Sequence, residues 1–109
     1  MRDVAIVSVA QTVHRGAATE LNEVEMIQPV ILEALQKAGV RKGEIDFTCS
    51  GSSDYLAGQA FSFVMTIDAV GPWPPISESH VEMDAAWALY EAWVKIQTGH
   101  ADTALVFSY

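Results

Sequence analysis

Apolar residues fall into short continuous runs and longer periodic stretches, which predict strands and helices in turn. The run Val4–Ala10 is apolar and β-branched almost throughout, which is typical of a strand covered on both faces. Apolar residues then recur with helical period over residues 24–38. Asn22 and Glu25 form a variant of the capping box at the start of this stretch, and Gly39 is a natural helix end. Pro29 within the stretch either kinks the helix or marks its first turn. The first two predicted elements are therefore a strand and a helix.

The same alternation continues to the end of the chain. Short strands are predicted at Ile45–Ser50, at Ile76–Val81 and within Ala101–Tyr109. Helices are predicted at Tyr55–Val70 and Glu82–Thr98. The order β-α-β-α-β-α-β predicts an α/β fold with a mostly parallel sheet and helices on its faces.

Charge and length limit what the chain binds. Its 109 residues carry 14 acidic and 6 basic side chains, a net charge of −8. This acidity argues against unassisted binding to nucleic acid or an anionic membrane. No apolar run reaches the roughly 18 residues of a membrane span, and residues 4–10 lack the flanks of a signal peptide. We therefore expect one domain in a cytoplasmic protein with no membrane span.

Cysteine and histidine give little sign of a metal site. The single cysteine, Cys49, excludes an internal disulfide and a cysteine-rich zinc site. It lies near a predicted strand end, so a reactive thiol is one interpretation. A buried structural thiol is favoured, because no nearby base would lower its pKa. His14, in a polar loop over residues 11–19, His80 and His100 are interpreted as surface or hydrogen-bonded side chains rather than metal ligands.

The junction before the last predicted helix is the strongest candidate site. A strand that leads directly into a helix aims free backbone N–H groups at one point, as in many anion sites. At this junction those groups would stabilise the carboxylates of Glu82 and Asp84. Simple helix capping is the alternative and is favoured by the residues alone.

Aromatic residues gather on neighbouring faces of the same helix, at Trp87, Tyr90 and Trp93, beside Val94. Packing in a core or an interface is favoured for them over a ligand cage.

Three segments share an order and spacing with a known family. They are Asp3–Val7 with the polar loop after it, Glu33–Val40 leading to Ile45-Asp46, and Ile96–Val106 with its Thr98-Gly99 helix end and Ala101-Asp102 strand start. The chain in this way resembles the N-terminal portion of the thiolase superfamily. It is most similar to thiolase-like lipid-transfer enzymes related to the sterol carrier protein-x thiolases. The resemblance implies that residues 1–109 are part of a thiolase-like domain, roughly its first third.

The resemblance singles out Glu82 as a catalytic candidate. The family places its acyl-accepting cysteine at the start of the helix predicted at 82–98. Counting back from Gly99 reaches Glu82, where the family's Cys-x-[Ser/Thr]-Gly becomes Glu82-Met83-Asp84-Ala85. A carboxylate is a poor substitute for a thiolate in thioester exchange. Glu82 is left as a base, a charge stabiliser or a catalytically idle residue.

The resemblance implies an acyl-CoA enzyme of lipid or steroid metabolism, an acyltransferase or a carbon–carbon lyase of retro-aldol type, without the usual cysteine. Its substrate would be a coenzyme A thioester, with no covalently bound cofactor and no metal. The family's catalytic histidine and second cysteine come from a later segment, so this chain alone is expected to be inactive.

A non-catalytic thiolase-fold binding or assembly subunit is the alternative. The resemblance implies a homodimer or hetero-oligomer with contacts at Ile76–Val81 and Trp87–Val94. An unrelated small α/β domain is the weakest interpretation.

Overall fold

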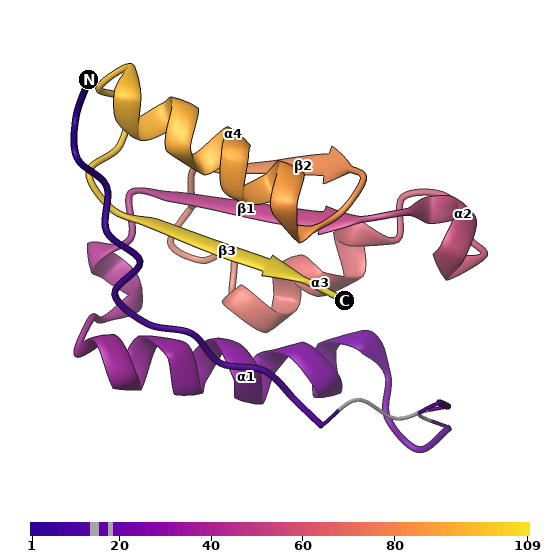
Figure 1. The fold of residues 1–109 in the computed structure, drawn as a ribbon. Helices are drawn as coiled ribbons and strands as arrows, with labels where there is room; N and C mark the ends of the chain where they lie inside the picture. The colour runs from indigo at the N-terminus through magenta and orange to yellow at the C-terminus, as the bar shows by residue number, and fades with distance from the viewer. Residues whose placement is uncertain (14–15, 18) are drawn as a thin grey trace.

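A parallel sheet of three strands forms the centre of the fold (Figure 1). The computed structural model describes residues 1–13, 16–17 and 19–109. In this part of the chain, β1 (Phe47–Ser52) pairs on one edge with β2 (Glu78–Glu82) and on the other with β3 (Ala104–Ser108), both in parallel. Every residue of β1 is buried, as expected of a central strand between helices. The α/β fold class predicted from the sequence is confirmed.

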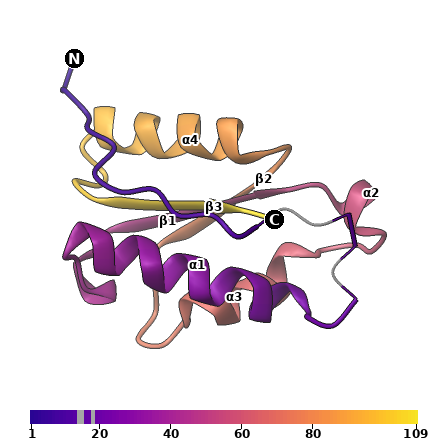
Figure 2. The same ribbon diagram turned by 60° about the horizontal axis from the view of Figure 1, so that its bottom comes forward.

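Helices cover both faces of this sheet (Figure 2). Helices α1 (Glu23–Ala38) and α3 (Phe63–Val70) lie on one face, and α4 (Ala85–Gln97) lies on the other. Alternate residues of each strand point to opposite faces, so two apolar clusters form. The first contains Ile27, Ile31, Ala69, Leu105 and Phe107, and the second contains Phe47, Cys49, Ala88, Ala92 and Ala101.

The start of α1 has the predicted capping box. The side chain of Asn22 accepts a hydrogen bond from the backbone N–H of Glu25 at 2.9 Å, and the Glu25 carboxylate accepts one from the Asn22 N–H at 2.9 Å. Gly39 ends the helix with a φ of 66°, a left-handed conformation that glycine adopts without steric cost. Both ends of this helix were predicted correctly.

The strand predicted at Val4–Ala10 is wrong. These residues lie outside any helix or strand, with most of their side chains exposed. Side-chain hydrogen bonds hold the segment instead, because Ser8 donates to the carbonyl of Ala34 and Lys37 donates to that of Val9. A strand must pair in register with a neighbour, and this segment pairs with the outer edge of neither β2 nor β3. The indigo segment in Figure 1 starts beside the C-terminal end of α4 and then passes over α1, without joining the sheet.

The helix predicted at Tyr55–Val70 is interrupted. It forms α2 (Asp54–Ala57) and α3, with Gly58 at a φ of 73° after the first. The carboxylate of Asp54 accepts hydrogen bonds from the backbone N–H groups of Phe61 and Ser62. These bonds close residues 58–62 into a loop, so α2 does not continue as a helix into α3.

The other boundaries differ by a few residues. The strands predicted at Ile45–Ser50 and Ile76–Val81 lie at β1 and β2, shifted toward the C-terminus, and the last strand is β3. A 3-10 turn, η1 (Lys42–Glu44), precedes β1. The loop predicted over 11–19 includes residues 14, 15 and 18, so the interpretation of His14 lies outside the described residues. No helix in the described ranges combines the length and apolar character needed to cross a membrane.

The contact between β1 and the start of α4 leaves no room for a side chain at Gly51. A Cβ atom there would lie 2.3 Å from the carbonyl oxygen of Asp84. We expect Gly51→Ala to lower the free energy of unfolding by about 1–3 kcal/mol, the usual cost of overpacking. Chemical denaturation measures this loss. Gly43→Ala is the matched control, because a Cβ at Gly43 meets nothing within 4 Å; equal stability of the two variants would contradict the packing.

Candidate functional site

The strand register gathers polar side chains at the carboxyl end of the sheet. Ser50 of β1 lies opposite His80 of β2, and Ser52 lies opposite Glu82. Because alternate residues share a face of a strand, these four side chains belong to the same face. The hydroxyl of Ser52 also donates to the Tyr109 hydroxyl at 3.3 Å. Carboxyl ends of parallel strands are where open α/β sheets place their sites.

His80 is the centre of this group. Its Nδ1 lies 2.9 Å from the Ser50 hydroxyl, and its Nε2 lies 3.4 Å from a carboxylate oxygen of Glu82. The ring stacks on Phe63 of α3, with centroids 4.3 Å apart and planes 12° apart. The side chain of His80 is 10% exposed. The prediction of a hydrogen-bonded histidine is confirmed, and its partners make it part of the candidate site.

Glu82 presents a carboxylate held at both oxygens. One oxygen accepts a hydrogen bond from the backbone N–H of Asp54 at 2.6 Å, and the other faces His80. Ser53, at the N-cap position of α2, makes no side-chain capping bond, so Glu82 satisfies an N–H group at this helix start. The side chain remains 53% exposed. Glu82 is therefore an oriented surface carboxylate next to a histidine.

The expected placement of Glu82 at the start of the last helix is wrong. Glu82 is the final residue of β2, and α4 begins at Ala85. The Asp84 carboxylate accepts hydrogen bonds from the N–H groups of Ala86 and Trp87. These groups are therefore capped from within the chain, which confirms the capping interpretation for Asp84. Glu82 receives its hydrogen bond from α2 instead.

Asp54 fixes the loop beside this carboxylate. It accepts hydrogen bonds from the N–H groups of Ser62 and Phe61 and from the Ser62 hydroxyl. The backbone bonds from Ser62 and Phe61 are the main cause of a lowered pKa for Asp54, and the charge of nearby His80 acts in the same direction. Asp54 is thus held as an anion that closes the loop, while its own N–H group orients Glu82.

Cys49 does not join this group. It lies on the opposite face of β1, in the cluster under α4, and is fully buried. Burial, with smaller effects of the negative charges of Glu91 and Glu78, raises the pKa of its thiol to about 11. The favoured interpretation of Cys49 as a buried structural thiol is confirmed.

Two of the three aromatic residues of α4, Trp87 and Tyr90, form an exposed stripe rather than a core, and Trp93 beside them is half-buried. Trp87 is 50% exposed and Tyr90 is 55% exposed, and both line an open hollow with Ala86. The ring of Tyr90 lies edge-on to Trp87 at 6.0 Å and stacks with Trp93 at 5.9 Å. Of the two packing interpretations, the core is wrong for Trp87 and Tyr90, and an interface stays a prediction.

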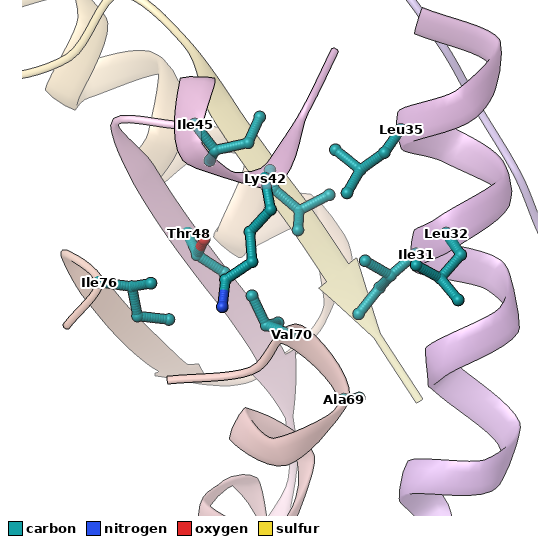
Figure 3. Close-up of a pocket in the computed structure, with 10 residues that line it drawn as sticks. Ile31, Leu32, Leu35, Lys42, Ile45, Thr48, Ala69, Val70 and Ile76 are labelled. Carbon is teal, nitrogen blue, oxygen red and sulfur yellow. The ribbon is translucent and has the colours of Figure 1, made fainter. Parts of the chain in front are cut away.

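A cavity of about 60 Å³ lies between the sheet and helices α1 and α3 (Figure 3), and neither His80, Glu82 nor the aromatic residues of α4 line it. Its walls are almost entirely apolar and include Ile31, Leu35 and Val70. The ammonium group of Lys42 at this cavity donates to the carbonyls of Gly71 and Trp73. Lys42 therefore stabilises the C-terminal end of α3, and the cavity is too small for a drug-sized ligand.

Metal ligation finds no support in the described residues, which contain no cluster of three or more His, Cys, Asp or Glu side chains able to hold an ion. His100 instead forms a 2.8 Å hydrogen bond with the Thr98 hydroxyl at the end of α4. Neither a scan of protein-family models nor a search of curated proteins matches this chain.

The sequence pattern points to Glu82 but does not reveal Ser50 as a partner of His80. The sequence signal that could have found this group is the alternation of polar residues in two strands. In Glu78-Ser79-His80-Val81-Glu82 the acidic and histidine side chains recur every second residue, as the hydroxyls do at Ser50 and Ser52. Such alternation places polar groups on one strand face. The pairing of the two faces depends on the register, which the pattern alone leaves open.

The burial of Cys49 predicts low thiol reactivity. At pH 8 a thiol with a pKa of about 11 is almost entirely protonated, and only the thiolate attacks disulfide reagents. We expect the folded protein to react at least about a hundredfold more slowly than the same protein in guanidinium chloride. The release of coloured thiolate from an aromatic disulfide reagent measures both rates. Equal rates would contradict the burial of Cys49.

Proposed function

We propose that this chain is the N-terminal portion of a thiolase-like enzyme that acts on a coenzyme A thioester without a nucleophilic cysteine. The observation that carries the proposal is the oriented carboxylate of Glu82, held by the Asp54 N–H group at 2.6 Å and facing His80 at 3.4 Å. By its spacing from Gly99 it matches the family's cysteine, although it ends β2 rather than beginning α4, and the only cysteine of the chain is buried on the other face of the sheet.

The chemistry that fits a carboxylate here is carbon–carbon cleavage of retro-aldol type. Glu82 accepts the proton of a hydroxyl group β to the thioester carbonyl, and that oxygen forms a carbonyl group as the carbon–carbon bond breaks. The bonding electrons pass to the thioester as an enolate, which is then protonated at carbon. A positioned base of this kind contributes about 10²–10⁴-fold to a rate. The substrate class is therefore a 3-hydroxyacyl thioester of coenzyme A, and the resemblance implies lipid or steroid metabolism.

Two supports for this proposal come from the site itself. Half of the Glu82 side chain is accessible, as a base that meets substrate requires. The neighbouring groups that contact it, His80 and the Asp54 backbone, fix its direction without covering it. Residues for binding coenzyme A are not assigned on this chain, since the resemblance assigns those loops to a later segment.

The test is the reaction of the protein from its complete reading frame with 3-hydroxyacyl-CoA substrates. Glu82→Gln is expected to lower kcat by about 10²–10⁴-fold, because the amide cannot accept the proton. Mass spectrometry measures the shortened acyl-CoA product and any acyl group attached to the protein. Glu78→Gln is the matched control, because Glu78 is an exposed residue on the same face of β2, at its other end. Equal loss in both variants, or a covalent acyl-enzyme, would contradict the proposal.

A non-catalytic assembly subunit is the second proposal, favoured by the aromatic stripe of α4. Trp87 and Tyr90 expose half of their surface around an open hollow. Aromatic residues are enriched at protein interfaces, where rigid rings bury a large area. The occupant we propose is a second copy of this chain, in line with the homodimer that the resemblance implies.

Assembly through this stripe is tested by the mass of the protein in solution. We expect a dimer by light scattering coupled to gel filtration, and Trp87→Asp to shift the protein to a monomer with its circular dichroism unchanged. Trp73→Asp is the control, because Trp73 is more exposed still, at 82%, and lies in the loop before β2. A monomeric wild type, or a dimer that survives Trp87→Asp, would rule out this surface.

A further inference from the structure

A line of three side chains runs from the interior of the sheet to the surface. Ser50 is 4% exposed, the His80 side chain is 10% exposed and the Glu82 side chain is 53% exposed. Ser50 lies 2.9 Å from Nδ1 of His80, and Glu82 lies 3.4 Å from Nε2. The two ring nitrogens of one histidine therefore face a buried hydroxyl and an exposed carboxylate.

The chemistry of the two neighbours fixes the direction of these contacts. An ionised carboxylate only accepts hydrogen bonds, whereas a hydroxyl both donates and accepts. The nitrogen that faces Glu82 must therefore carry the hydrogen. In the neutral imidazole Nδ1 then has a lone pair, which accepts the Ser50 O–H. This combination satisfies every member of the line, and the alternative tautomer would direct a lone pair of Nε2 at the negative Glu82.

The surroundings of the ring keep it in this orientation. Phe63 of α3 stacks on one side of the imidazole at 4.3 Å and carries no charge. The ionisable groups that face His80 are Glu82 on its own strand and Asp54 on α2. Both are acceptors, so neither competes with Ser50 for the lone pair of Nδ1.

We propose that Ser50 is a positioning residue: its hydroxyl holds neutral His80 in the tautomer with hydrogen on Nε2. The Nε2–H group of His80 then donates its hydrogen bond to the Glu82 carboxylate. Ser50 acts through His80 and touches no substrate. The catalytic use of this arrangement rests on the proposed function of Glu82, whereas the tautomer itself does not.

The tautomer is measured directly by long-range ¹H–¹⁵N correlation spectra of the imidazole at about pH 8, which also distinguish a neutral ring from a doubly protonated one. The His80 signal is assigned by its loss in His80→Gln. We expect the wild type to show one tautomer, with hydrogen on Nε2. Ser50→Ala is expected to raise the population of the other tautomer by about two- to tenfold, as loss of one hydrogen bond implies. Ser50→Thr keeps the hydroxyl and is expected to restore the wild-type spectrum.

The wild-type spectrum alone decides the main point, even if Ser50→Ala fails to fold. Hydrogen on Nδ1, or a mixture equal to that of exposed His100 in the same spectrum, would overturn the proposal. So would a folded Ser50→Ala with an unchanged tautomer. A fixed tautomer in a protein that lacks turnover of 3-hydroxyacyl-CoA would support the role of Ser50 and count against the proposed function, so the two failures are distinguishable.

Discussion

The fold and its polar site both depend on β1 accepting a parallel neighbour on each edge. A central strand with all of its residues buried must satisfy its backbone groups within the sheet, because burying them unpaired costs free energy. The pairing with β2 also sets Ser50 opposite His80 and Ser52 opposite Glu82. A slip of one residue would turn these side chains to the face under α4, where Phe47 and Cys49 now pack.

Close packing at Gly51 links this register to the last helix. The backbone of Asp84 approaches β1 where a side chain would not fit, and Asp84 then caps α4 with its carboxylate. Because this aspartate satisfies the helix start, Glu82 is free to bind the N–H group of Asp54. The two carboxylates therefore have different roles. The Asp84 carboxylate caps α4, and the Glu82 carboxylate is an oriented anion at the surface.

Local signals allowed much of the fold to be predicted from the sequence. The capping box at Asn22 and the glycine at the end of α1 depend on neighbouring residues alone, and their prediction was correct. The strand expected at Val4–Ala10 has the right residues, but the segment forms hydrogen bonds with Ala34 and Lys37 of α1 instead of pairing with an edge of the sheet, which is a tertiary condition. Glu82 was named from spacing, yet its neighbours His80 and Ser50 come from strand register, which single-strand patterns do not reveal. The helix start was placed three residues early because Glu82 and Asp84 both suit such a position.

The most direct test of the central claim, that the register presents Glu82 to the Asp54 backbone, is the amide proton shift of Asp54 at neutral pH in the wild type and in Glu82→Gln. The Asp54 N–H group donates to Glu82 at 2.6 Å, and charge-assisted bonds of this kind are short and strong. We predict a strongly downfield Asp54 amide proton in the wild type, a clear upfield change in Glu82→Gln, and an unchanged Ser62 amide, which donates to the Asp54 carboxylate. An Asp54 amide with the same shift in both proteins would contradict the account.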